Sequence, residues 1–459
     1  MPRLGRAREL VLGLCLLSSS CQRRDEAAQA RHALASLPYL AEVPVKPEHA
    51  HKAGVVLHDA ASAVPGLNLY TSKRWTEARL VDMEGRVVHV VRGEPSPPLS
   101  ATIAPRIQEV LGGWMHVELG PSGNLFVIEE MRAVSQRDLS GKRSWTAEIP
   151  AHHDLAPTPD GRVFVLSATP RRLTVGGRAE TFLDNVIVEL SPKGRVRSRR
   201  SLLDLLAAHP ETTQLLNAAL AKRAGWSSEV NEGTLSLGSA LERQQALPDL
   251  QAYLAGKPMP ERLACMLLYL TPADVLHTNT LELLPHDVPL LGRKGDFLLS
   301  VRNLDLVLVI SATTSQVSWH FGPGELEEQH QPSLLPNGHV LVFDNGVRSR
   351  RSRVLEIDPA DNRIVWRYEG AAQGKSAFFT PFMGGAQGLD GGNVLITDST
   401  SSRAFEVNRA GAIVWDYFDP SMIAEKPTEA ARAARERRTL TLYRVARIPF
   451  DALPNALRP

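Results

Sequence analysis

The sequence predicts an all-β protein, a six-bladed β-propeller with a helical insertion between blades, and three observations predict it. The 459 residues include 33 glycines and 32 prolines spread along the chain, and so many turn formers favour short strands over long helices. Short apolar runs alternate with turn signals and repeat. Trp319, Trp366 and Trp415 recur 47 and 49 residues apart, which is the period that a four-stranded propeller blade needs.

Each repeat has the pattern strand, turn, strand. A three-residue turn that begins with Pro or Asp and ends with Gly precedes most of the hairpins. Its glycine supplies the positive φ needed between the two inner strands of a blade. These turns are Pro121–Gly123, Pro159–Gly161, Pro336–Gly338 and Asp390–Gly392. The repeats predict blades over residues 113–149, 151–200, 276–321, 329–369 and 384–418, with a sixth over 68–92.

Two segments depart from the repeat. Residues 440–448 form a late apolar β run after a helix-like stretch at 428–437, and we expect this run to close the ring onto the first blade, because closure hides exposed strand edges. Residues 201–272 carry apolar side chains at helical spacing, as in Leu202–Ala208. This insertion is expected to be a lid over the propeller mouth, a homodimer contact or a surface elaboration.

The first residues predict export. Arg3, Arg6 and Arg8 precede an uncharged apolar stretch at 10–17, followed by small residues, which is the order of a cleaved signal. Eight apolar residues are too few to cross a bilayer of about 30 Å as a helix. The sequence therefore predicts a signal peptide over residues 1–20.

A cysteine follows this signal directly. Cys21 ends a Leu-Ser-Ser-Ser-Cys run that resembles a bacterial lipobox, with plain secretion as the alternative, and Gln22 resembles the sorting position of outer-membrane lipoproteins. We expect a periplasmic protein with a tether over 21–50 and a propeller over 51–453, in contact with the membrane through its lipid only. Cys265 then remains alone, so no disulfide and no cysteine-based metal cluster is expected.

The charge balance excludes one class of partner. The chain has 52 basic and 50 acidic residues and a formal net charge of only +2. No field covers the whole protein that would attract nucleic acid or an anionic membrane. Any anion must therefore be bound by a local site, and nucleic acid is not an expected partner.

Three histidines take equivalent positions in successive repeats. His330 and His153 each lie eight residues before the turn glycine of their blade. His277 precedes Leu281 by four residues, as His330 precedes Leu334. Because the inner strands of a propeller line its central channel, these equivalent starts are expected to converge around one opening.

An arginine accompanies the histidines. Arg302 lies seven residues after Gly295, and Asn345 has the same offset from Gly338, so this position also carries polar side chains near the axis. A planar guanidinium suits an oxyanion with three equivalent oxygens. A neutral imidazole, with a pKa of about 6.5, can attack a sulfuryl or phosphoryl centre. Zinc on three imidazoles is the alternative, but the adjacent Arg302 would repel a dication, so no metal and no cofactor is expected.

Taken together, these motifs resemble the bacterial aryl-sulfate sulfotransferase family over most of residues 53–450. Members of that family are exported six-bladed propellers that use a histidine nucleophile. The motifs that carry the resemblance are His152–Leu155, His277–Asn279, Ser300–Arg302, Gln329–Gly338, Val342–Gly346 and Ser402–Val407. The resemblance implies transfer of a sulfuryl group from a phenolic sulfate donor to a phenol acceptor, without a nucleotide sulfate donor.

The resemblance also implies roles for the catalytic residues. His330 matches the sulfated nucleophile, and Arg302 matches the arginine that binds the sulfuryl oxygens. His277 matches a supporting histidine, and one of the pair His152 and His153 matches another. The register of the repeats favours His153 as the catalytic member of that pair.

Two further side chains, His152 and Asn279, are expected to contact the substrate, and the cycle implied is ping-pong through a sulfohistidine. The alternative function is a non-catalytic envelope propeller that serves as a binding or assembly scaffold, because a fold does not determine a function. A quinone-cofactor dehydrogenase is disfavoured, since the sequence shows neither a vicinal cysteine pair nor a carboxylate set for calcium.

Overall fold

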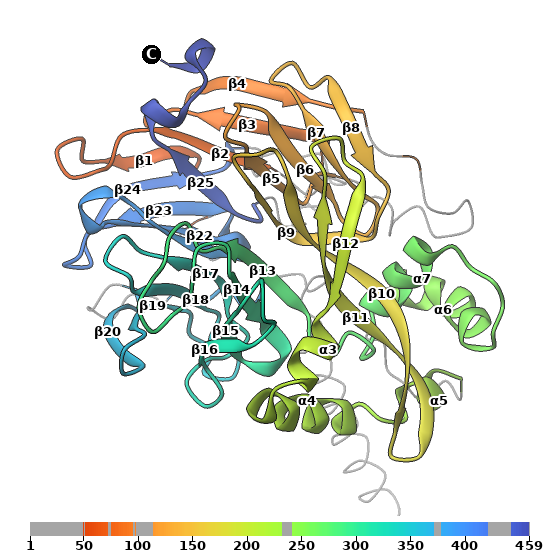
Figure 1. The fold of residues 1–459 in the computed structure, drawn as a ribbon. Coiled ribbons are helices and arrows are strands. Elements are labelled where there is room, and N and C mark those ends of the chain that lie inside the picture. Colours follow the sequence, from red (N-terminus) through yellow and green to blue (C-terminus); the bar gives the residue numbers. More distant parts are fainter. Residues whose placement is uncertain are drawn as a thin grey trace, which may run out of the picture.

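The computed structural model describes residues 49, 51–71, 75–94, 97, 113–231, 241–370, 378–420 and 442–458. Within them, six antiparallel sheets surround a central axis (Figure 1). The predicted fold class, a six-bladed β-propeller with helices between blades, is confirmed. The expected signal peptide, the tether with Cys21 apart from residue 49, and the helix-like stretch at 428–437 lie outside the described residues. None of the described helices is long and apolar enough to span a membrane.

The first three blades follow the chain in order, and each is named here by its number. Blade 1 contains β2 (Leu67–Thr71), β3 (Glu77–Val81) and β4 (Val87–Arg92). Blade 2 contains β5 (His116–Leu119), β6 (Leu125–Glu129), β7 (Ala133–Arg137) and β8 (Arg143–Ala147). Blade 3 contains β9 (Ala151–Pro157), β10 (Val163–Val175), β11 (Arg178–Leu190) and β12 (Val196–Ser201).

The other three blades follow the helical insertion. Blade 4 contains β13 (Thr278–Leu283), β14 (Phe297–Val301), β15 (Leu306–Ile310) and β16 (Val317–Phe321). Blade 5 contains β17 (His330–Leu334), β18 (Val340–Asp344), β19 (Arg353–Asp358) and β20 (Arg363–Tyr368). Blade 6 contains β21 (Gly385–Gly388), β22 (Val394–Asp398), β23 (Arg403–Val407), β24 (Ile413–Phe418) and, as a fifth strand that the repeats did not predict, β1 (Gly54–His58).

Short 3-10 helices connect several of these elements. They are η3 (Arg302–Leu304), η4 (Asp390–Gly392), η5 (Ser399–Ser401), η7 (Phe450–Ala452) and η8 (Asn455–Leu457). The predicted turns lie between the first two strands of their blades, and their glycines adopt a positive φ, +82° at Gly161 and +85° at Gly338. The turn chemistry read from the sequence is therefore confirmed.

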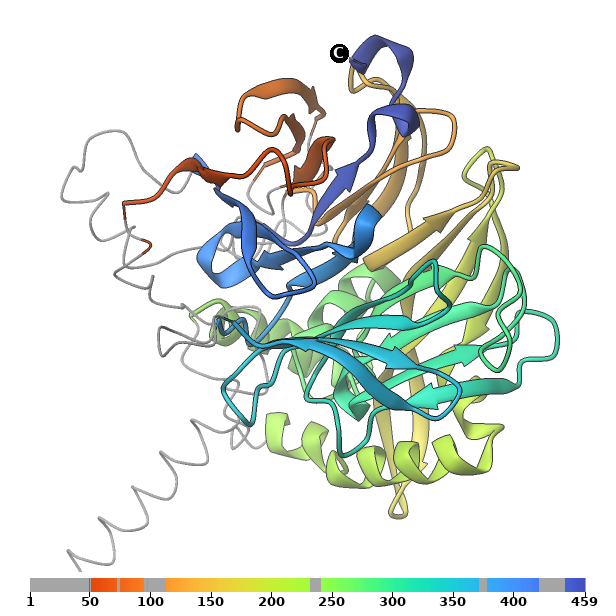
Figure 2. The same cartoon turned by 90° about the vertical axis from the view of Figure 1, so that its left-hand side faces the viewer.

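The ring closes through strands from the two ends of the chain. Strand β25 (Val445–Ile448) pairs with β2 as the inner strand of blade 1, as predicted for the 440–448 segment. Figure 2 shows this C-terminal segment beside the N-terminal strands. Arg447 of β25 is 1% exposed, and its guanidinium donates to Asn68 Oδ1 of blade 1 (2.6 Å) and to Glu406 Oε2 of blade 6 (3.0 Å). One buried cation therefore joins the first and last blades.

The repeated tryptophans join neighbouring blades in the same way each time. Each lies in the fourth strand of its blade, and its indole N–H donates to the next blade around the ring. The three bonds run from Trp319 to Asn362 Oδ1 (2.8 Å), from Trp366 to the Arg409 carbonyl (3.0 Å) and from Trp415 to the Met83 carbonyl (2.9 Å). The 47- and 49-residue spacing thus reflects one repeated contact between blades.

The described part of the insertion, residues 201–231 and 241–272, contains five helices. They lie beside the long β10–β11 hairpin (Figure 1). They are α3 (Leu202–Ala207), α4 (Pro210–Lys222), α5 (Trp226–Asn231), α6 (Leu241–Leu254) and α7 (Glu261–Tyr269). Helix α7 is buried at every residue from Leu263 to Tyr269. A helix that is apolar all round belongs in a protein interior, so α7 is part of the core and packs on β10 and β11.

We predict that Arg447→Met lowers the free energy of unfolding by about 3–5 kcal/mol, because it leaves the fully buried Glu406 carboxylate without its cation. Urea unfolding followed by circular dichroism measures this loss. The control is Arg363→Met, which removes an exposed arginine from a loose ion pair with Asp361 and is expected to change the stability little. Equal losses in the two variants would contradict the role of Arg447.

Candidate functional site

The three histidines of the repeats lie at the starts of three successive inner strands. His153 is in β9, His277 directly precedes β13, and His330 begins β17. In each of these blades the pairing of the inner strand slips by a β-bulge at or beside the histidine, and a bulge re-aims the side chains next to it. His153 and His277 also adopt positive φ values of +55° and +47°, which are unusual for residues other than glycine. Their ring centroids lie 4.7 Å apart.

Arg302 lies in η3, directly after β14, and is 1% exposed. One of its terminal nitrogens contacts the Glu328 carboxylate, and the other donates to Asn303 Oδ1 at 2.9 Å. Its buried Nε has no hydrogen-bond partner among the described residues. Burial lowers the pKa of both His277 and His330, and the nearby positive charge of Arg302 lowers both further.

The proton on His330 is assigned by its neighbours. Asn345 donates through Nδ2 to the carbonyls of Thr380 (2.8 Å) and Met383 (2.9 Å), so its Oδ1 faces His330 Nδ1 at 2.7 Å. The Glu328 carbonyl also lies 3.2 Å from this nitrogen. Both neighbours are acceptors, so Nδ1 carries the proton and Nε2 keeps the lone pair. Burial, together with the charge of Arg302, lowers the pKa of His330 to about 3, which keeps the ring neutral.

His277 is held by a carboxylate on the turn that leads from the insertion to blade 4. Its Nδ1 contacts Asp274 Oδ2, and its backbone N–H donates to Asp274 Oδ1 at 3.1 Å. Burial raises the pKa of Asp274 to about 7 and lowers that of His277 well below its ordinary value. With Asp274 ionised, a neutral His277 donates from Nδ1 to this carboxylate, and its Nε2 carries the lone pair, as in His330.

The adjacent His152 and His153 are hydrogen-bonded to each other. His152 Nε2 donates to the Ser167 carbonyl at 3.0 Å, so its Nδ1 accepts from His153 Nδ1, also at 3.0 Å. Burial lowers the pKa of His152 to about 4, so its ring is neutral. His153 Nε2 lies 3.4 Å from the hydroxyl of Tyr269, which donates to Glu130 Oε1 at 2.8 Å. His153 Nδ1 thus carries a proton, as Nδ1 does in His330.

The two side chains expected to contact substrate have defined partners in this structure. The ring of His152 is held by Ser167 and His153, as described above. The fully buried Asn279 donates to the carbonyl of Gln329 at 2.9 Å, directly before His330. The structure thus brings all six predicted site residues into one region, and substrate contact by His152 and Asn279 stays a prediction.

Several side chains of this region were not identified from the sequence. Tyr269, at the end of α7, stacks on His277 with centroids 5.3 Å apart and an interplanar angle of 22°. His116, at the start of β5, and Arg444, directly before β25, both reach Asp154. Arg444 directly precedes the inner strand of blade 1, just as His277 directly precedes the inner strand of blade 4. Aligning the closing strand with the other inner strands would therefore have identified Arg444. The sequence of the insertion gives no such signal for Tyr269.

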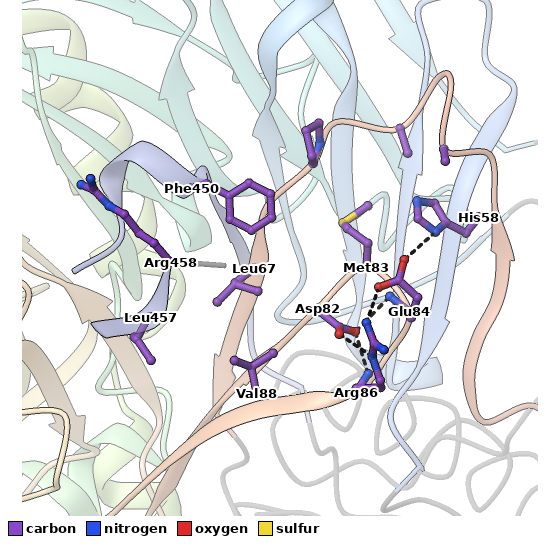
Figure 3. A pocket seen from close by; sticks show the side chains of 13 residues that line it. His58, Leu67, Asp82, Met83, Glu84, Arg86, Val88, Phe450, Leu457 and Arg458 are labelled. Atoms are coloured by element: carbon purple, nitrogen blue, oxygen red, sulfur yellow. Dashed lines mark hydrogen bonds and ion pairs between the residues drawn. The ribbon is translucent and has the colours of Figure 1, made fainter. Parts of the chain in front are cut away.

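Among the described residues, no group of three or more His, Cys, Asp or Glu side chains is placed to hold a metal ion. A cavity of about 470 Å³ lies elsewhere, between blade 1 and the C-terminal η7 and η8 (Figure 3). Four of its side chains pair with one another: Arg86 with Asp82 at 2.7 Å, and His58 with Glu84 at 3.6 Å. Arg458 donates to the backbone carbonyls of Leu453 and Asp451. The cavity shares no lining residue with the histidine cluster, and the function proposed below does not use it.

Fold and site together define a six-bladed propeller with a buried histidine and arginine cluster at the starts of its inner strands. Two family models, both described as Arylsulfotransferase (ASST), match residues 58–327 and 268–419, and the first alone spans more than half of the chain. The chain therefore belongs to the arylsulfotransferase family, and the resemblance inferred from its motifs is confirmed. No curated protein matches it.

Solved structures resemble the chain in fold. A protein of unknown function from Bacteroides caccae is 14% identical with a TM-score of 0.42, and the match covers 79% of this chain and 96% of that one. A streptogramin B lyase is 7% identical with a TM-score of 0.40, over 84% and 87% of the two chains. The β-propeller domain of Cps50 (Swd1) from Myceliophteria thermophila is 12% identical with a TM-score of 0.38, over 80% and 89%. Similarity this low carries no argument about the chemistry of the site.

We predict that the neutral, buried His330 lowers the stability of the protein progressively as the pH falls from about 6.5 to 4. In this range the unfolded chain binds protons on imidazoles with a pKa near 6.5, whereas folded His330, with a pKa of about 3, does not bind one. His330→Asn removes this difference and should flatten the slope by about one proton, roughly 1.4 kcal/mol per pH unit. Urea unfolding at a series of pH values measures both slopes, and equal slopes would refute the assignment.

Proposed function

We propose that this chain is an aryl-sulfate sulfotransferase that moves a sulfuryl group from a phenolic sulfate ester to a phenol through a sulfohistidine at His330. The observation that carries the proposal is the neutral His330, with Nδ1–H bound to Asn345 and a lone pair on Nε2, within electrostatic reach of Arg302. Membership of the arylsulfotransferase family supports the same substrate class. The signal-like residues 1–20 and Cys21 support a periplasmic, lipid-anchored location.

In the first half-reaction, His330 Nε2 attacks sulfur, an N–S bond forms, and the S–O bond to the donor breaks with release of a phenolate. Because Nδ1 keeps its proton, the sulfated ring is formally cationic, which makes it a good leaving group. Asn345 Oδ1 and the Glu328 carbonyl accept from that N–H and stabilise the positive ring. Arg302 neutralises the charge on the sulfuryl oxygens.

In the second half-reaction, the acceptor phenol loses its proton to His277 Nε2, attacks sulfur and breaks the N–S bond. The Asp274 carboxylate holds His277 in the tautomer that can accept this proton and stabilises the imidazolium that forms. The proton then passes to the phenolate of the donor or to water, so the exchange balances. The neighbouring His153 and Tyr269 pack against His277 and hold its ring in place.

We predict that His330→Asn abolishes transfer between 4-nitrophenyl sulfate and phenol. Mass spectrometry of the wild-type protein after brief exposure to the donor should show an adduct of roughly 80 Da on a peptide that contains His330, since one nucleophile carries the covalent group. The matched control is His286→Asn, which changes an exposed histidine outside the cluster. Full transfer by His330→Asn, or an adduct on another residue, would overturn the mechanism.

We predict that Asn345→Leu lowers kcat by about 10- to 100-fold and leaves KM for the donor nearly unchanged. The leucine fills the space of the amide but offers no acceptor to the charged Nδ1–H of sulfated His330, and such a bond is worth about 1.5–3 kcal/mol. Steady-state kinetics with 4-nitrophenyl sulfate give both constants. A rise in KM with an unchanged kcat would mean that Asn345 acts in substrate binding instead.

A further inference from the structure

Arg444 is a buried cation that the mechanism above does not use. It directly precedes β25, and its side chain is 8% exposed. One terminal nitrogen donates to Asp154 Oδ1 at 3.1 Å. The other terminal nitrogen and Nε are buried and have no hydrogen-bond partner among the described residues. Among the described residues, only one terminal nitrogen of the guanidinium thus has a hydrogen-bond acceptor.

Asp154 fixes where this guanidinium lies. It follows His153 in β9, and its Oδ2 accepts from the backbone N–H of Leu281 in blade 4 at 3.1 Å. Its Oδ1 also lies 3.4 Å from His116 Nε2 of blade 2. Arg444 therefore reaches from blade 1 to a carboxylate one residue from His153, and its charge contributes to the lowered pKa of His330.

Two arginines thus approach the histidines from opposite blades. Arg302 comes from blade 4 and Arg444 from blade 1, three blades apart in a ring of six. Each is paired with one carboxylate, Glu328 and Asp154 respectively, and each keeps a buried N–H without a partner among the described residues. The shared feature is a guanidinium that is already held in place but still lacks acceptors.

Buried N–H groups of a charged side chain without acceptors cost free energy, so an occupant that supplies acceptors is favoured. The Nε and terminal N–H on one edge of a guanidinium form a fork that matches two oxygens of one oxyanion. Asp154 compensates much of the charge of Arg444, which suits a singly charged sulfuryl ester better than a multiply charged ligand. A sulfuryl group meets both requirements.

We propose that Arg444 is a second anion-binding residue of the site and that its Nε edge binds two oxygens of the sulfuryl group, opposite Arg302. The proposal rests on the proposed function for the identity of the group that is bound. Asp154 is then a positioning residue that aims the guanidinium. Its negative charge also offsets part of the positive charge that Arg444 presents to the ligand.

Binding without turnover tests this directly. In the His330→Asn background, isothermal titration with 4-nitrophenyl sulfate gives Kd, and Arg444→Gln should raise it at least about tenfold, the loss expected for a hydrogen bond to a charged group. Asp154→Asn keeps an amide oxygen that can hold Arg444 in place but removes the negative charge, so it should leave Kd unchanged or lower it. Arg363→Gln, at an exposed site, is the matched control.

The different changes in Kd expected for the two variants distinguish a role in ligand binding from a role in the fold. If the pair only supported the fold, Arg444→Gln and Asp154→Asn would weaken binding alike, and that result would overturn the proposal. The double variant leaves neither charge unpaired, so it keeps the fold, checked by near-ultraviolet circular dichroism, and should still bind weakly. An unchanged Kd in Arg444→Gln or in the double variant, or no binding in the His330→Asn background, would also overturn it.

The wild-type protein distinguishes this proposal from the proposed function. Transfer by the wild type, together with an unchanged Kd in Arg444→Gln, would refute the role of Arg444 and leave the sulfotransferase assignment intact. Weakened binding in Arg444→Gln, together with no transfer and no adduct in the wild type, would support Arg444 as an anion-binding residue and refute the sulfotransferase assignment.

Discussion

The pairing of β25 with β2 is the interaction on which the rest of the structure depends. Six twisted sheets in a row have two open edges, and the starts of their inner strands converge only when the last segment of the chain joins the first blade. The same short segment carries Arg447, which bridges blades 1 and 6, and Arg444, which reaches Asp154 in blade 3. The segment that closes the ring therefore also brings Arg444 to the site.

Burial gives the site its chemical character. Removal from water disfavours a charged imidazole, so His330 and His277 are neutral at ordinary pH. Each then needs an acceptor on Nδ1, which Asn345 and Asp274 supply, and this leaves the lone pair on Nε2. The low dielectric also strengthens the effect of each arginine, and Glu328 and Asp154 limit the cost of burying those charges.

The helical insertion takes part in the site. Helix α7 packs against blade 3, and its last residue, Tyr269, lies between Glu130 and the rings of His153 and His277. The end of α4 brings Arg223 close enough for the charges of Asp274, Arg302 and Glu328 to affect its pKa, although burial is the main cause of its lowered value. A segment that looks additional in the sequence thus contributes directly to the surroundings of the imidazoles.

The sequence by itself determined the repeat, the turns and the closing strand, because strand alternation, turn glycines and register are local properties of the chain. It also indicated six candidate site residues, whose roles stay predictions. It did not reveal β1, Tyr269 or the Arg444–Asp154 pair, and it did not assign the proton on each imidazole. Those features depend on contacts between residues far apart in sequence, such as Arg444 with Asp154 and Tyr269 with Glu130. Only the twist and closure of the blades decide which of these residues meet, since no local periodicity records a contact across the ring.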